Sequence, residues 1–212
     1  MEGVMDLSQV RAVLFDMDGT LVTSDAAVER AWATWSDEYC VDVAEVLAIA
    51  HGSPAESTVD RVLPHLDELA RANAAARQLQ LQYDDLSDVE AAPGAAEVIA
   101  VIERLGIRWA VVTSADRQLA KARLGAAGID APVLVTIEDI TRGKPDPQGY
   151  LRAAELLETA PEQCVVVEDA SVGIQAGHAA GAITAALKGL SGDLELTDLH
   201  QLAELIAPRP RE

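Results

Sequence analysis

Two carboxylates lie one residue apart where an apolar segment near the start of the chain ends. Residues 13–21 read VLFDMDGTL, which places Asp16 and Asp18 directly after a run of Val, Leu and Phe. Asp and Gly are poor strand formers, so folding alone does not account for a pair of acids at this point. In an extended chain, residues i and i+2 project to the same side, and the two carboxylates are therefore expected to face one site.

Three further segments carry polar side chains that could act with this pair. The apolar run WAVVT ends in Thr113 and is followed by Ser114, and the run CVVVE ends in Glu168 and is followed by Asp169. Between them, the segment GKPDP holds Lys144 in a loop that two prolines stiffen. Because ligands in open α/β sheets bind beyond the carboxyl ends of the strands, we expect these groups at one edge of a sheet.

This set of groups suits phosphoryl transfer assisted by a divalent cation. Carboxylates that converge on one point repel each other unless a cation lies between them, and Mg²⁺ binds one or two carboxylates together with waters and substrate phosphate. A carboxylate is also a competent nucleophile toward phosphorus, giving an aspartyl-phosphate. Positioning and charge neutralisation supply most of what phosphoryl transfer requires, and Lys144 with Mg²⁺ would provide the neutralisation. Each motif alone is a weak signal, and the prediction depends on their occurring together.

The apolar pattern predicts the elements that position these groups. Short runs rich in β-branched residues and without alternation predict a parallel sheet covered on both faces. These runs are residues 11–16, 109–113, 133–136, 164–168 and 182–187. Helical patterns that end at Gly or before Pro separate the later runs, at residues 94–105, 116–127, 147–158 and 171–180. This order predicts a doubly wound α/β fold.

Residues 25–85 interrupt this order because they contain no convincing strand. Four segments are predicted helices, namely residues 25–39, 43–50, 55–63 and 66–83. In the first of them, Trp32, Trp35 and Tyr39 stand at i, i+3 and i+7, which predicts one buried stripe rather than a surface for stacking sugars. We therefore expect a small helical domain inserted after the first strand of the sheet.

Composition limits the partners and the location. The net charge is −19, and no basic run exists, whereas nucleic acids and anionic membranes require clustered Lys and Arg. No apolar run approaches the ~20 residues of a membrane span, and the first ten residues lack the pattern of a secretory signal. A cytoplasmic location and a monomer are the default expectations. The two cysteines, Cys40 and Cys164, predict no disulfide framework.

Four motifs together resemble those of the haloacid dehalogenase superfamily. They are DMDGTL at 16–21, VVTS at 111–114, GKPDP at 143–147 and VVEDA at 166–170. The helical insertion after the first motif resembles the cap of the superfamily's first cap class. Further segments are similar to the sugar and sugar-alcohol phosphatase branch: AVERAWATW at 27–35, the His51-Gly52 pair, VVTSADR at 111–117 and RGKPDP at 142–147.

The resemblance implies a Rossmann-like doubly wound parallel sheet with an inserted all-helical cap domain. It implies a core domain over residues 1–22 and 90–212 and a cap domain over residues 23–89. It also implies a Mg²⁺-dependent phosphatase that acts on a small phosphorylated sugar or polyol, without settling which one. The cap would close over the leaving group and exclude water from the reaction.

The resemblance also implies a role for each motif residue. Asp16 would be the nucleophile and a metal ligand, and Lys144 would neutralise the nucleophile and the phosphate. Asp18 would protonate the leaving alcohol, activate the hydrolytic water and ligate the metal through its backbone carbonyl. The other predicted residues are Gly19, Thr20, Thr113 and Ser114 for phosphate, and Asp169 with Glu168, directly or through water, for the metal.

Two cap residues and three rival functions stay open at this point. By the resemblance His51 would face the substrate, but a histidine at a helix C-terminus is also favourable when charged. Arg61 is either a substrate contact or a solvated helix residue. A β-phosphoglucomutase-like phosphomutase has a histidine where this chain has Val28. A dehalogenase would not need Asp18, and a phosphate-binding protein derived from a phosphatase would have lost a motif residue.

Overall fold

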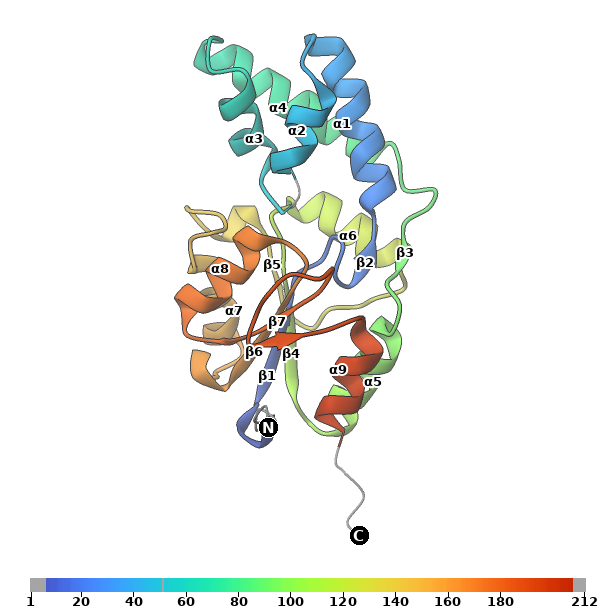
Figure 1. Ribbon diagram of the computed structural model, residues 1–212, viewed down its shortest axis with the longest axis vertical. Coiled ribbons are helices and arrows are strands. Elements are labelled where there is room, and N and C mark those ends of the chain that lie inside the picture. The colour runs from blue at the N-terminus through green and yellow to red at the C-terminus, as the bar shows by residue number, and fades with distance from the viewer. Residues whose placement is uncertain (1–6, 51, 208–212) are drawn as a thin grey trace.

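The computed structural model describes residues 7–50 and 52–207 and contains a six-stranded parallel sheet (Figure 1). The strand order is β5-β4-β1-β6-β7-β8, and every neighbouring pair is parallel. The strands are β1 (Ala12–Phe15), β4 (Arg108–Val112), β5 (Leu134–Val135), β6 (Cys164–Glu168), β7 (Ile183–Ala186) and β8 (Leu194–Glu195). Because β1 lies at the centre between β4 and β6, the ends of these three strands are neighbours.

Both faces of the sheet are covered, as the continuous apolar runs predict. On one face, Val13 and Phe15 pack with side chains of helices α5 (Ala95–Arg104), α6 (Arg117–Ala126) and α9 (Leu199–Ile206). On the other face, Ala12 and Leu14 pack with side chains of α7 (Gln148–Leu156) and α8 (Ser171–Ala180). Figure 1 shows α7 and α8 to the left of the sheet and α5 and α9 to its right.

Four helices form a separate helical unit, defined here as α1–α4. They are α1 (Asp25–Tyr39), α2 (Val43–Ala50), α3 (Ala55–Val62) and α4 (Glu68–Tyr83). The unit has its own apolar core, in which Trp32 and Trp35 are buried and the Trp35 indole N–H donates to the Ala74 carbonyl at 2.8 Å. The predicted stripe of Trp32, Trp35 and Tyr39 is confirmed by ring contacts of 5.2 and 4.7 Å between centroids.

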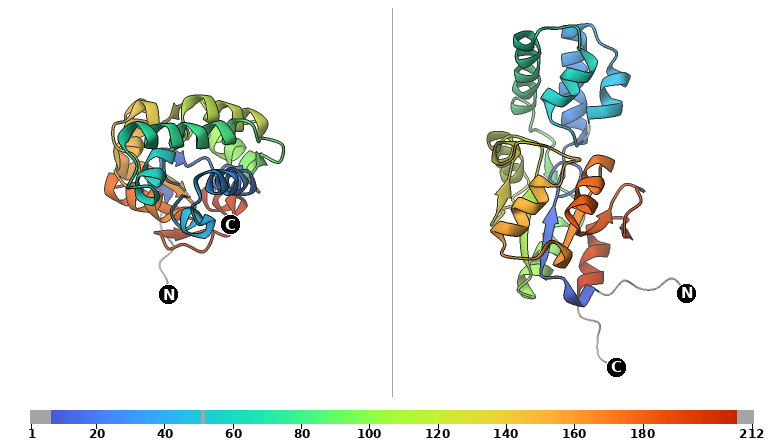
Figure 2. Two further views of the ribbon diagram at one scale, coloured as in Figure 1. Left: turned by 90° about the horizontal axis from the view of Figure 1, so that it is seen from above. Right: turned by 90° about the vertical axis from the view of Figure 1, so that its left-hand side faces the viewer.

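The helical unit stands at one end of the sheet and connects to it through two short strands. β2 (Val22–Thr23) leads into α1, and β3 (Glu90–Ala91) follows α4 and leads back toward the sheet. The two strands pair antiparallel. In Figure 2, the right-hand view shows the unit above the sheet and its helices, and the left-hand view looks down onto the unit. These two connecting strands hold the start and the end of the helical unit side by side, directly after the first sequence motif.

The predicted elements agree closely with the observed ones, and the last part of the chain adds others. The four predicted helices of the unit match α1–α4 to within two residues at each end. Strand β8 and helix α9 fall after residue 187, where the apolar runs predict nothing further. Three short 3-10 helices complete the fold: η1 (Leu7–Gln9), η2 (Ile137–Asp139) and η3 (Pro161–Gln163). Both cysteines are free, and no described helix is long and apolar enough to cross a membrane.

Candidate active site

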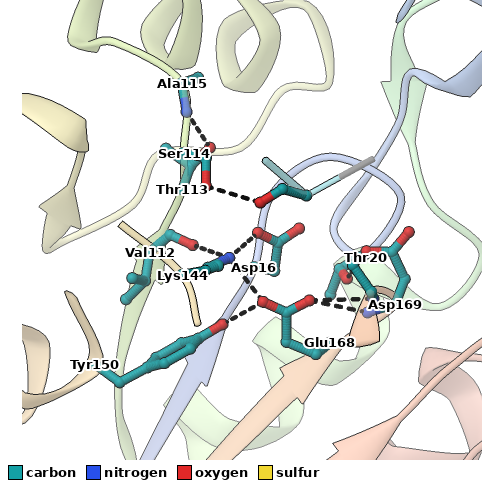
Figure 3. A network of polar contacts seen from close by, with 12 residues as sticks. Asp16, Thr20, Val112, Thr113, Ser114, Ala115, Lys144, Tyr150, Glu168 and Asp169 are labelled. Atoms are coloured by element: carbon teal, nitrogen blue, oxygen red, sulfur yellow. Dashed lines mark hydrogen bonds and ion pairs between the residues drawn. The ribbon is translucent and has the colours of Figure 1, made fainter. Parts of the chain in front are cut away.

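The ends of β1, β4 and β6 bring the predicted residues together (Figure 3), at the end of the sheet nearest the helical unit (Figure 1). The backbone N–H of Asp16 still bonds to the Val167 carbonyl at 3.0 Å, so Asp16 extends β1 by one residue beside β6. Thr113 is placed in the same way, because its N–H bonds to the Val135 carbonyl at 3.0 Å. Pairing of the parallel strands thus fixes the positions of the first groups.

Lys144 lies between two of the predicted carboxylates. Its ammonium group pairs with the Asp16 carboxylate and, at 2.7 Å, with Glu168 Oε1, and it donates to the Val112 carbonyl at 3.2 Å. Burial lowers the pKa of Lys144, but the carboxylates of Asp16 and Glu168 outweigh this effect and raise the pKa above its ordinary value. Lys144 is therefore charged, and its ammonium group is a buried positive charge next to Asp16.

Glu168 is fully occupied by protein donors. Tyr150 donates its hydroxyl to Glu168 Oε1 at 2.5 Å, and the N–H groups of Asp169 and Ala170 lie 3.2 and 3.3 Å from Oε2. Burial raises the pKa of the Tyr150 hydroxyl well above its ordinary value, so that this group stays a donor. The contacts orient Glu168 toward Lys144, and they favour an indirect rather than a direct part for Glu168 in metal binding.

Three carboxylates gather closely enough to hold a cation. Oxygen atoms of Asp16, Glu168 and Asp169 lie within 4.8 Å of one another. Burial raises the pKa of Asp16 well above its ordinary value, and Glu168 and Asp169 add to the rise while Lys144 opposes it. Burial also raises the pKa of Asp169, against the effect of Lys188, whose ammonium lies 2.9 Å from Asp169 Oδ2. Buried oxygen ligands whose charge is incompletely balanced fit a hard divalent cation.

Asp18 lines the same cleft as Asp16, as expected, but the chain reaches it through a turn and not along an extended strand. The N–H groups of Leu21 and Val22 bond to the Met17 carbonyl at 3.0 and 2.9 Å, which closes the turn. Asp18 Oδ1 accepts a hydrogen bond from the Ser24 hydroxyl at 2.6 Å. Asp18 therefore belongs to the wall of the cleft and is held by the residue that precedes α1.

Gly19 and Thr20 lie beside Asp169. Gly19 has φ of +81°, and a Cβ atom there would lie 2.1 Å from Asp169 Oδ2, so both the backbone conformation and the space require glycine. The Thr20 hydroxyl is buried and donates to Asp169 Oδ1 at 3.4 Å. The predicted phosphate-binding pair thus borders the carboxylate cluster.

Ser114 joins the sheet to the helical unit. Its hydroxyl donates to the Gly52 carbonyl at 3.0 Å, whereas the Thr113 hydroxyl accepts a hydrogen bond from the Ala115 N–H at 3.1 Å. Both residues line the cleft with Asp16. His51, the predicted substrate contact next to Gly52, lies outside the described residues. Arg61 is exposed in the last turn of α3 and does not line the cleft.

The cleft runs from the carboxylate cluster into the helical unit. The part of its lining that lies at the strand ends is defined here as the inner end and is formed by Asp16, Asp169, Thr113 and Ser114. The part formed by α1, α4 and α6 is defined as the outer end, and it has apolar side chains and two polar ones that the sequence motifs do not indicate: Val28, Trp32, Leu79, Leu119, Gln82 and Arg123. A phosphate group at the inner end would place the rest of its substrate against the helical unit.

Three residues that contact or line the candidate site have no place in the sequence motifs: Tyr150, Arg123 and Lys188. Lys188 directly follows the predicted strand at 182–187, so the rule that located Asp16 and Asp169 could have found it. Tyr150 and Arg123 lie inside helices, and no local signal distinguishes them from other helical residues. Their roles depend on which elements pack together.

Comparisons with known proteins show the family of this chain. A family model for haloacid dehalogenase-like hydrolases matches residues 10–181. Hexitol phosphatase A of Escherichia coli is 38% identical over an alignment of 200 residues, which covers 92% of this chain and 93% of that protein. The 2-deoxyglucose-6-phosphate phosphatase 1 of Saccharomyces cerevisiae is 35% identical, over 81% of this chain and 77% of that protein.

Similarity of fold extends to more distant proteins. The crystal structure of β-phosphoglucomutase from Clostridium difficile superposes with a TM-score of 0.82 at 19% identity, over 93% of this chain and 97% of that one. This likeness concerns the fold alone. With the family model covering residues 10–181 and the four motifs gathered at one edge of the sheet, the chain belongs to the haloacid dehalogenase-like hydrolases.

Proposed function

We propose that this protein is a Mg²⁺-dependent phosphatase that hydrolyses the phosphate ester of a small sugar or sugar alcohol through an aspartyl-phosphate on Asp16. The observation that carries the proposal is the placement of Asp16, which is buried between Lys144 and the other carboxylates at the inner end of the cleft. The names of the relatives, a hexitol phosphatase and a 2-deoxyglucose-6-phosphate phosphatase, support this class of substrate.

The reaction proceeds in two steps. In the first, a carboxylate oxygen of Asp16 attacks phosphorus, the bond from phosphorus to the alcohol oxygen breaks, and Asp18 gives its proton to that oxygen. In the second, Asp18 takes a proton from water as the water oxygen attacks phosphorus, and the bond from phosphorus to Asp16 breaks. Lys144, Thr113 and Ser114 stabilise the charge on the transferring phosphoryl group.

The carboxylate cluster fits Mg²⁺ by the chemistry of its donors. Asp16, Asp169 and the backbone carbonyl of Asp18 would hold the ion, and Glu168 would act through water or by orienting Lys144. When bound, the cation neutralises the converging carboxylates and the phosphate.

The proposal also divides the chain into two domains and assigns each a task. Residues 1–22 and 90–212 form the core that carries the chemistry, and residues 23–89 form a cap that selects the alcohol. Val28 supports hydrolysis over a phosphomutase reaction, because it lines the cleft and its side chain cannot transfer a proton. His51 remains a predicted substrate contact, and the cytoplasmic, monomeric state remains an expectation.

Release of phosphate tests the proposal directly. Phosphate release from sugar, polyol, nucleotide and glycolate phosphates is measured in the presence of Mg²⁺, and the substrates are ranked by kcat/KM. The same assay is repeated in EDTA and with the Asp16→Asn variant. We expect the best substrate to be a sugar or polyol phosphate and turnover to stop in EDTA and in the variant. Activity that survives Asp16→Asn would remove the nucleophile assignment, and a nucleotide or glycolate phosphate as best substrate would contradict the proposed class.

A further inference from the structure

Arg123 is a buried charge in the wall of the cleft, and no motif accounts for it. It lies on α6 and is only 1% exposed. Its Nη1 lies 2.7 Å from Asp18 Oδ1, and its Nη2 donates to Gln82 Oε1 at 2.8 Å. Burial of a guanidinium is costly unless it is paired, so these two contacts must be the reason that it is tolerated here.

Arg123 holds Asp18 through one oxygen only. Asp18 Oδ1 receives both the guanidinium and the Ser24 hydroxyl. For Oδ2 of Asp18, the structure shows no hydrogen bond or ion pair to any described residue. A carboxyl group anchored in this way can accept at Oδ1 in either protonation state, and Oδ2 is left to carry the proton that is given to the alcohol and taken from water.

The other end of Arg123 reaches the helical unit. Gln82 belongs to α4, and its amide group donates to Oε1 of the fully buried Gln78 at 2.5 Å. One residue further, the Tyr83 hydroxyl donates to Asp116, which also caps the start of α6 by accepting from the Leu119 N–H at 2.8 Å. The contact of Arg123 with Gln82 therefore exists only while α4 is packed on α6.

We propose that Arg123 is a positioning residue for the proton transfer by Asp18, and that Gln82 makes this positioning depend on the packing of the helical unit against α6. The guanidinium fixes the direction of the Asp18 carboxyl, and Gln82 fixes the guanidinium. The inference rests on the proposed phosphatase function. It adds to that function a residue, Arg123, that contacts both the proposed acid Asp18 and Gln82 of the helical unit.

Substrates whose leaving groups differ in basicity distinguish a loss of Asp18 positioning from a general loss of structure in the active site. An alkyl alcohol must be protonated as it leaves, whereas 4-nitrophenol departs without help. In Arg123→Met, we expect release of alcohol from the best sugar or polyol phosphate of the panel to slow by about 100-fold, the scale of a misplaced catalytic group. The first equivalent of 4-nitrophenol should be released at the wild-type rate. Later turnovers should be slow, because Asp18 is no longer positioned to take the proton from the hydrolytic water. The signature is a burst equal to the enzyme concentration in rapid-mixing experiments.

Three more variants make the result specific. Arg123→Lys keeps the charge but cannot bridge Asp18 and Gln82, so it should restore only part of the rate. Gln82→Leu should produce the same burst more weakly and keeps the test available if Arg123→Met does not fold, which the melting temperature reports. Lys121→Met, on an exposed position of the same helix, should behave as the wild-type enzyme.

The outcomes distinguish the inference from the function on which it rests. If the wild-type enzyme hydrolyses neither kind of ester, the proposed function fails and the inference fails with it. If the wild-type enzyme is active and folded Arg123 or Gln82 variants slow both first steps equally, or change neither, Arg123 has only a structural role. A burst with 4-nitrophenyl phosphate together with a slow alkyl ester supports the inference.

Discussion

At the scale of residues, the site is a small set of buried charges that stabilise one another. Lys144 compensates both Asp16 and Glu168, and Tyr150 fixes Glu168 from the other side. Removal of Lys144, the shared cation of this group, leaves two carboxylates buried without compensation, which costs more than the pair contributes to stability. The effect of a substitution here is therefore expected in stability and in activity together.

Lys144→Ala tests this coupling. Loss of the ammonium group removes the positive charge beside the nucleophile, so kcat/KM for the best phosphate ester should fall by at least about 100-fold. The free energy of unfolding without metal should fall by about 3 kcal/mol, because two buried carboxylates lose their partner. Steady-state kinetics and urea unfolding measure the two effects, with the exposed Lys121→Ala as control. Unchanged kinetics would reduce Lys144 to a loop residue.

At the scale of elements, the segments after the strands are held by side chains that satisfy backbone groups. The 3-10 helix η2 follows β5 and is closed by a capping box, in which Asp139 Oδ2 accepts from the Thr136 N–H at 2.8 Å and from its hydroxyl at 3.0 Å. Burial raises the pKa of Asp139, but the hydrogen bonds from Thr136 and the neighbouring Arg117 outweigh it and hold the pKa below its ordinary value.

Asp139→Ala should therefore destabilise the protein in a pH-dependent manner. The folded state binds the Asp139 proton less tightly than the unfolded state, so the contribution is present above the unfolded pKa of about 3.9 and disappears as the pH falls through the folded value. We expect a loss of about 1 kcal/mol in the free energy of unfolding at pH 7, and a smaller loss below about pH 4. Urea unfolding of both proteins across this range decides the point, and a difference independent of pH would contradict it.

At the scale of the whole molecule, an acidic chain concentrates three carboxylates at the junction of sheet and helical unit. The net charge is −19, yet two ammonium groups, those of Lys144 and Lys188, lie against this cluster. They leave the cluster incompletely neutralised. Burial therefore raises the pKa of Asp16 and of Asp169 in spite of the neighbouring lysines. On the proposed function a divalent cation would supply the remaining compensation, and its binding would then be linked to stability.

Metal-free stability should consequently depend on pH through Asp16. Because its folded pKa lies above the unfolded value of about 3.9, the folded state binds the proton more tightly, and the free energy of unfolding falls as the pH rises through that interval. In EDTA, Asp16→Asn should be more stable than the wild-type protein by a margin that grows from pH 4.5 upward.

Mg²⁺ should reverse this order. On the proposed function it would bind the ionised site of the folded wild-type protein, and it should therefore raise the melting temperature of this protein more than that of Asp16→Asn. Melting temperatures across the same pH range measure both effects, with the exposed Asp37→Asn as control. A margin that does not change with pH, or an equal response of both proteins to Mg²⁺, would exclude Asp16 as the linked group.

Local sequence determined most of the fold and the chemical groups of the site. Apolar runs rich in Val specify the strands because such segments are stable only in a buried sheet, and the ends of neighbouring parallel strands must meet at one edge. From the sequence alone, this reasoning predicts that Asp16, Thr113 and Asp169 lie at that edge. The helical insertion is equally local, because apolar periodicity marks α1–α4 and the Asp67 side chain caps the start of α4.

Tertiary structure alone decided how these groups are held. Arg123 and Gln82 are 41 residues apart, Tyr150 and Glu168 are 18 apart, and each pair meets only because two elements pack at a particular angle and register. Neither helix carries a local signal for its polar residue, since the free energy that permits a buried guanidinium or hydroxyl comes from its partner on another element. The direction of Asp18 is set in the same way, by a turn and by a helix more than a hundred residues further along the chain.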